Sequence, residues 1–150
     1  ATRAEAAEIG ELLWDWFEER FPPLNRSLMD TWDLLPANEY GIILLYGIGQ
    51  SEGMWRVREL PAVRRIFGEI WGDGDLVCDF GGAVAFRPAA CTDRWRTPER
   101  WYHVDMNGAS YRGFDSAQAF VALTDNTAET GGLVVIPGSQ RHHQDVSARA

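Results

Sequence analysis

The chain has 150 residues, of which 45% are hydrophobic and 12% aromatic, enough to build the packed core of one domain. Its net charge of -8 argues against a nucleic-acid partner, because phosphate binding depends on cationic side chains. All 14 basic residues are arginine, which excludes a phosphate-loop lysine and Schiff-base chemistry from this segment. No apolar run approaches the roughly 20 residues of a membrane span, so we expect no membrane partner.

The two cysteines and the chain ends carry further information. Cys78 and Cys91 fit neither a disulfide-rich framework nor the spacing of a zinc site, which favours free thiols in a reducing compartment. The sequence shows no targeting segment, so we expect a cytoplasmic location. The chain opens with Ala1 and stops at Ala150 without a structural signal, and we therefore expect a piece of a longer protein.

Two helices are predicted in the first 72 residues. Apolar residues recur every three or four positions from Glu5 to Phe21, and Pro22 ends this pattern. A shorter helical patch covers Ser27 to Leu35, while periodicity does not decide the structure of the apolar run 41–48. The second helix begins at Pro61, which suits a first helical position, and keeps its periodicity until Gly72.

After residue 72 the pattern changes to short apolar runs bounded by Gly, Pro and Asp. These runs predict strands at Leu76 to Phe80, Ala83 to Arg87, Trp101 to Met106, Ser116 to Leu123 and Leu133 to Ile136. Helices followed by strands favour an α+β fold in which N-terminal helices pack outside a jelly-roll or barrel. We therefore assign residues 1–72 to a helical N-terminal part and residues 73–150 to the first half of the barrel, within a single domain.

The triplet His103-Val104-Asp105 is a candidate metal site. Residues two apart in a strand project from the same face, so the imidazole and the carboxylate would point the same way. Iron(II) oxygenases hold their metal with two histidines and one carboxylate and leave the remaining positions open. The triplet would supply two of these ligands. On its own the pattern is weak, because a strand histidine is often just hydrogen-bonded to a neighbour.

The surroundings of the triplet resemble a known family. A run from Gln118 to Leu123 precedes a loop with Glu129-Thr130-Gly131-Gly132, and a further apolar run then ends in Pro137-Gly138-Ser139. Upstream stands Phe86-Arg87-Pro88. Together these segments resemble the phytanoyl-CoA dioxygenase-like (PhyH-like) iron(II)- and 2-oxoglutarate-dependent oxygenases over about residues 76 to 143. The combination is specific, although each part alone is not.

This resemblance implies a double-stranded β-helix, a cupin-like jelly roll, whose cofactors are Fe(II), 2-oxoglutarate and O2. It implies that His103 and Asp105 are catalytic iron ligands, that a small-molecule C–H bond is hydroxylated, and that 2-oxoglutarate becomes succinate and CO2. Phe120 and Gln118 would line the 2-oxoglutarate pocket, unless they only pack in the core. Arg87 would approach the co-substrate carboxylate, or else form a surface salt bridge.

Several positions depart from the family pattern. Thr130 and Gln140 stand where the family usually has asparagine and histidine, although neither position is an iron ligand. In the family, the distal histidine and the arginine that anchors 2-oxoglutarate lie on later strands, so we expect both beyond residue 150. We do not expect His142 or His143 to bind iron. The alternative is a non-catalytic jelly-roll fragment or binding module. Trp101 and Tyr111, beside the triplet, could line a substrate pocket or pack under a loop.

Overall fold

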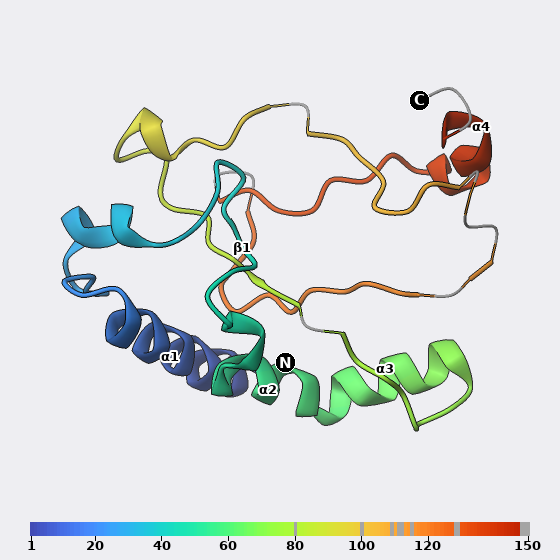
Figure 1. The fold of residues 1–150 in the computed structure, drawn as a ribbon, viewed down its shortest axis with the longest axis horizontal. Helices are drawn as coiled ribbons and strands as arrows, with labels where there is room; N and C mark the ends of the chain where they lie inside the picture. The colour runs from blue at the N-terminus through green and yellow to red at the C-terminus, as the bar shows by residue number, and fades with distance from the viewer. Residues whose placement is uncertain are drawn as a thin grey trace.

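The structure is a computed structural model that describes residues 1–79, 81–99, 101–108, 110, 113–114, 116–127 and 130–147. Phe80, Tyr111 and Glu129 lie outside the described residues. Helices occupy the first half of the chain and form one side of the molecule, while the second half runs mainly as extended segments (Figure 1). The helical part that we expected before residue 72 is therefore present.

Helix α1, Arg3–Arg20, confirms the first predicted helix. Its first turn is closed by a capping box: the Thr2 hydroxyl accepts from the Glu5 amide at 3.2 Å, and the Thr2 amide donates to the Glu5 carboxylate at 2.7 Å. Its inner face buries Ile9, Leu13 and Phe17. This face supplies much of the core, and the buried positions follow the helical spacing of the apolar residues.

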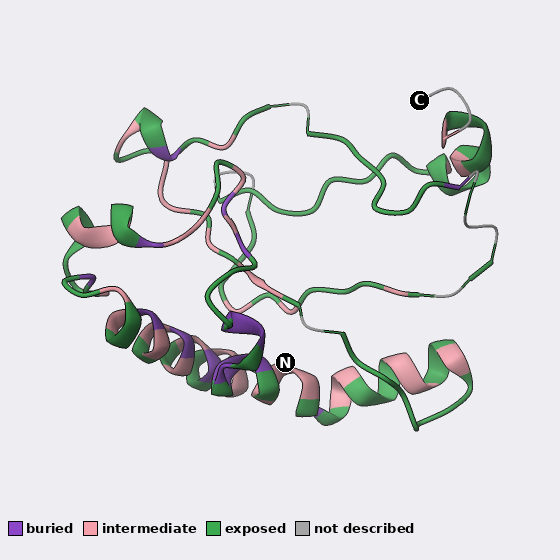
Figure 2. Ribbon diagram, viewed as in Figure 1, coloured by how far each residue is buried: buried purple, intermediate pink, exposed green. Residues whose placement is uncertain are grey.

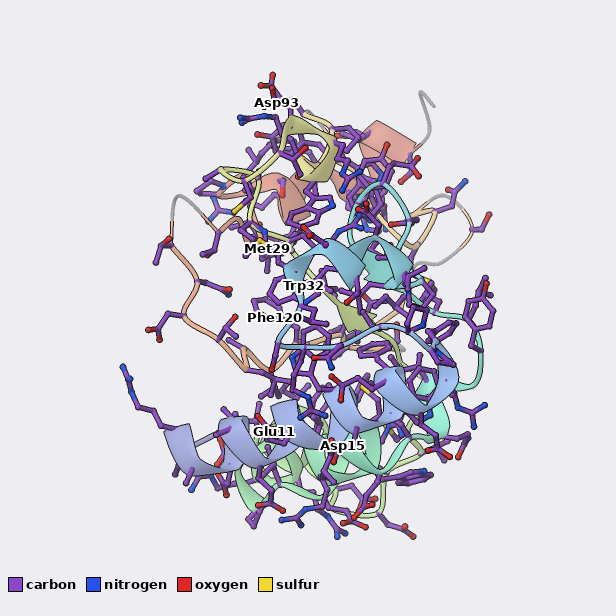
Figure 3. All side chains as sticks on the ribbon, turned by 90° about the vertical axis from the view of Figure 1, so that its left-hand side faces the viewer. Glu11, Asp15, Met29, Trp32, Asp93 and Phe120 are labelled. Atoms are coloured by element: carbon purple, nitrogen blue, oxygen red, sulfur yellow. The ribbon has the colours of Figure 1, made fainter. Side chains whose placement is uncertain are left out.

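An arginine fastens the turn after α1 to the helix. The Arg26 guanidinium donates to Glu18 at 2.8 and 3.1 Å and also pairs with Glu11 and Asp15. Figure 3 shows Glu11 and Asp15 on α1, one helical turn apart. The same turn leads into the 3-10 helix η1, Met29–Leu34, where the sequence predicted a helical patch.

The undecided apolar run 41–48 divides into three parts. Strand β1, Ile42–Ile43, comes first, an exposed turn follows, and the 3-10 helix η2, Ile48–Gln50, ends the run. Helix α2, Glu52–Glu59, was not predicted. Its N-cap is Ser51, a buried residue whose hydroxyl accepts from the Met54 amide at 3.3 Å.

Helix α3, Pro61–Trp71, confirms the second predicted helix and ends at Gly72, which adopts the left-handed conformation (φ 67°). Strand β2, Ala83–Val84, pairs antiparallel with β1, with Ile42 opposite Val84. The remaining elements are the 3-10 helices η3, Asp93–Trp95, and η4, Ser139–His142, and helix α4, His143–Ser147. No helix within the described ranges is both long and apolar enough to cross a membrane.

The core lies between α1, α2 and the β1–β2 pair, as the buried segments in Figure 2 show. Its apolar members come from the first 60 residues, and Val121 and Leu123 from the second half pack against them. The fully or largely buried members are Ile9, Leu13, Phe17, Leu24, Leu35, Ile43, Ile48, Met54 and Leu60.

The second half differs from the strand pattern that we expected. Of the five predicted strands, only the second contains paired residues among those described, at Ala83–Val84. A strand requires a partner for its amides and carbonyls, and residues 133–136 leave apolar side chains 58–72% exposed. The α+β character is thus present as helices with one small two-stranded sheet. The jelly roll stays a prediction.

Candidate metal site at His103 and Asp105

His103 and Asp105 lie close together, although residues 101–104 do not form the strand on which that expectation rested. Nε2 of His103 lies 3.2 Å from Oδ1 of Asp105, and the two side chains are about half exposed. Two ligands that occupy neighbouring octahedral positions at bond lengths of about 2.1 Å are about 3 Å apart. One cation could therefore contact both atoms. Because each side chain is reachable from solvent, the pair remains accessible to a metal ion and further ligands.

The orientation of the His103 ring is set by a neighbouring carbonyl. Nδ1 of His103 lies 3.2 Å from the carbonyl oxygen of Trp101. A carbonyl oxygen only accepts, so a hydrogen bond here requires a proton on Nδ1, and the Asp105 carboxylate makes the same demand on Nε2. A metal ion bound at Nε2 would take the place of that second proton beside the Asp105 oxygen. Metal-binding histidines in general donate their other ring nitrogen to a carbonyl or carboxylate in this way.

Helix α4 packs against the segment that follows Asp105. Nε2 of His143 donates to the Met106 carbonyl oxygen at 2.7 Å, and the Gly108 amide donates to the Ser147 hydroxyl at 3.0 Å. A side chain at Gly108 would meet the His143 carbonyl oxygen at 3.1 Å, so glycine allows this close approach. The His143 ring thus contacts the backbone of Met106, the residue that follows the triplet. Among the described residues, no group of three or more His, Cys, Asp or Glu side chains is arranged to hold a metal.

Arg87 lies in a polar cluster with η1 and η3. Its guanidinium donates to the Trp32 carbonyl oxygen at 3.3 Å and pairs with Asp33 at 3.7 Å. Asp33 also binds Arg94 at 2.5 Å and accepts from the Trp95 indole. The structure thus pairs a largely buried Arg87 with Asp33, while its approach to a co-substrate carboxylate stays a prediction.

Phe120 and Gln118 are exposed, which does not fit simple core packing. Phe120 lines a shallow pocket of about 420 Å³ with the loop residues Asn126, Thr127, Gly131, Gly132, Leu133 and Val134. Figure 3 shows Phe120 between η1 and α1 in that view. No hydrogen bond or ion pair within the described part of the chain joins Arg87, Gln118 or Phe120 to the His103–Asp105 pair.

Tyr40 is a neighbour of the site that sequence reasoning missed. Its ring stacks on Trp101 with centroids 4.0 Å apart. The Trp101 ring in turn packs on the His103 ring, with centroids 4.3 Å apart. Tyr40 belongs to the turn before β1, far from the triplet in the sequence. No local pattern signals this contact, because it depends on how the first and second halves fold together.

Comparisons with known proteins match the part of the chain that contains this pair. Residues 80–150 match the family described as phytanoyl-CoA dioxygenase (PhyH), and this segment contains both His103 and Asp105. A protein of Dictyostelium discoideum described as "Putative phytanoyl-CoA dioxygenase" is 26% identical over 110 residues. That match covers 70% of this chain. No solved structure gives a significant match.

Both matches support a PhyH-like family for this chain, which confirms the resemblance seen in its motifs. The match spans 31% of the length of the Dictyostelium relative. The matched family and the relative are both described as dioxygenases. The reaction, the cofactors and the substrate of the whole protein are matters for proposal.

Proposed function

We propose that this chain forms part of an Fe(II)/2-oxoglutarate-dependent dioxygenase that hydroxylates a C–H bond of a small molecule. The observation that carries the proposal is the 3.2 Å approach of His103 Nε2 to Asp105 Oδ1 inside the PhyH-matched segment. When bound, iron and 2-oxoglutarate would supply the oxidising chemistry together with O2, one oxygen atom of which would enter the product and the other succinate, with release of CO2.

The chain's own contribution is to hold and orient the metal. With Nδ1 engaged by the Trp101 carbonyl, His103 would present Nε2 to the metal, and Asp105 would supply the negative oxygen beside it. In this proposal a second histidine and the arginine for 2-oxoglutarate come from outside the 150 residues. The jelly roll would be completed by the same part of the protein, which would give partners to extended segments such as 133–136.

The co-substrate pocket is proposed at Phe120. Its exposed ring lines the pocket formed with Gly131 and Gly132, and an apolar aromatic wall of this kind suits the two methylene groups of 2-oxoglutarate. Gln118 would donate its amide to a carboxylate or keto oxygen there. The ion pair of Arg87 with Asp33 favours a structural role for that arginine.

The test is 2-oxoglutarate turnover by the full-length protein. We expect Fe(II)-dependent succinate release that His103→Ala abolishes, because two remaining protein ligands do not complete the facial set. His142→Ala is the matched control, since it removes an exposed imidazole from η4, and it should retain turnover. Succinate release that survives His103→Ala would contradict the assignment. A wild-type protein without turnover and without metal binding would support the alternative binding module.

A further inference from the structure

We propose that Tyr40 is a positioning residue for His103, acting through the ring of Trp101. The inference rests on the proposed function in that it takes His103 as an iron ligand. It goes beyond the family match, because that match begins at residue 80 and Tyr40 lies outside it. The first half of the chain would thus determine how the metal ligand is presented.

The rings of Tyr40, Trp101 and His103 pack one against the next, from the turn before β1 to the candidate metal site. Tyr40 and Trp101 are stacked with an interplanar angle of 15° and centroids 4.0 Å apart. Trp101 and His103 are tilted by 31° with centroids 4.3 Å apart. The backbone adds a second connection, because the Trp101 carbonyl oxygen engages His103 Nδ1. Trp101 therefore contacts His103 through both its ring and its carbonyl oxygen, and so holds the plane of the imidazole.

Tyr40 is itself held firmly by the turn before β1. The Asn38 side-chain oxygen accepts from the amides of Tyr40 and Ile42 at 3.0 and 2.9 Å. The Asn38 amide donates to the Ile42 carbonyl at 3.0 Å, and the Gly41 carbonyl accepts from Ala85 at 2.8 Å. Ile43, the next residue of β1, is fully buried. These contacts fix the backbone of Tyr40 relative to the β1–β2 pair and the core.

The triplet needs such a support because residues 101–104 belong to no regular element. Without a backbone ladder, the direction of the His103 ring depends on side-chain contacts. Aromatic pairs of this geometry have measurable coupling energies, and loss of an outer contact of a metal ligand weakens metal affinity by about tenfold or more. Removing the Tyr40 ring should release Trp101 and let the imidazole turn.

The test measures Co(II) affinity of the full-length protein without oxygen, in the wild type and in Tyr40→Leu. We expect roughly three- to tenfold weaker binding in Tyr40→Leu, because the ring contact is lost but both ligands remain. Tyr40→Phe keeps the stacking ring and should restore wild-type affinity. Tyr46→Leu is the control, since Tyr46 packs on Phe21 and not on Trp101. Equal affinities in the wild type and Tyr40→Leu would overturn the proposal.

A second readout does not depend on the metal. The chain has three histidines, so the ring nitrogens of His103 can be resolved in a 15N-labelled protein. In Tyr40→Leu, the ring nitrogen signals of His103 should shift, whereas those of His142 should not change. Unchanged His103 signals would overturn the positioning role. The wild type could fail to bind Co(II) while the His103 signals still change in Tyr40→Leu. That result would contradict the iron site and leave the positioning role of Tyr40 intact.

Discussion

Nε2 of His103 lies 3.2 Å from Oδ1 of Asp105, although the segment around them is not a paired strand. The pair therefore owes its geometry to the single intervening residue and to the contacts of Trp101 with the His103 ring. Because this geometry depends on a few neighbouring residues, we expect metal binding to be sensitive to the length of the Asp105 side chain.

Asp105→Glu should show this sensitivity. The longer side chain keeps the charge but moves the carboxylate by one methylene group, so the oxygen no longer sits at the spacing that one cation requires. We expect metal affinity and turnover to fall at least about tenfold while the melting temperature is unchanged. Glu99→Asp, an opposite change in length outside the triplet, should leave both unchanged. Wild-type turnover in Asp105→Glu would show that carboxylate placement is not critical.

A pair of glycine variants tests the close approach of β1 and β2. A Cβ at Gly82 would lie 2.3 Å from the Ile43 carbonyl oxygen, so Gly82→Ala should push the strands apart and destabilise the fold by more than about 1 kcal/mol. Gly10 lies inside α1 with nothing within 4 Å of its Cβ position. Gly10→Ala should instead stabilise the fold by about 0.5–1 kcal/mol. Denaturant unfolding measures both, and destabilisation by Gly10→Ala or tolerance of Gly82→Ala would contradict this packing.

Ile43 and Leu44 form another matched pair, because they are adjacent but differ completely in burial. Ile43 is fully buried, whereas Leu44 is 67% exposed. Ile43→Ala should lower the free energy of unfolding by about 2–5 kcal/mol through the cavity it leaves. Leu44→Ala should change it by less than about 0.5 kcal/mol. Similar losses in the two variants would mean that β1 does not anchor the core as described.

The contacts between Glu18 and Arg26 predict an acid-sensitive contribution to stability. Hydrogen bonds from the Arg26 side chain and amide lower the pKa of the Glu18 carboxyl below its usual 4.5. A carboxyl with a lowered folded-state pKa stabilises the protein above its unfolded-state pKa, and this contribution is lost as the pH falls through the folded-state value. The stability difference between wild type and Glu18→Gln should therefore be largest near pH 7 and shrink below about pH 4. Thermal unfolding across that range measures it, with Glu19→Gln as the control; a difference that grows on acidification would contradict the pairing.

The helices were predictable because their signals are local. The apolar spacing in α1 and the Pro61 and Gly72 boundaries of α3 each act within a few residues. Helix α2 was missed because its 8 residues span only about two turns, too few for an apolar pattern to be recognised. The expected strands depended on partners that are distant in the sequence. Only Ala83–Val84 finds such a partner among the described residues, at β1.

The candidate site likewise has features that the sequence predicted and features that it could not predict. The motifs around His103 and Asp105 pointed to the family that residues 80–150 match. The contact between the two side chains was expected from a strand, whereas the structure forms it without one. The salt bridge of Arg87 to Asp33 and the stacking of Tyr40 on Trp101 join residues from opposite halves of the chain. Sequence reasoning allowed a salt bridge for Arg87 but could not name its partner, and it had no means of finding Tyr40.

The central claim is that Asp105 and His103 share one iron ion. Equilibrium dialysis of Fe(II) without oxygen, performed on the full-length protein, tests it most directly. We expect about one Fe(II) per chain in the wild type and in the control variant Asp125→Asn. Asp125 is exposed and forms a long ion pair with Arg3, at 3.9 Å. Asp105→Asn should lose this binding, because it removes the negative oxygen while preserving the size of the side chain. Wild-type stoichiometry and affinity in Asp105→Asn would contradict the metal site.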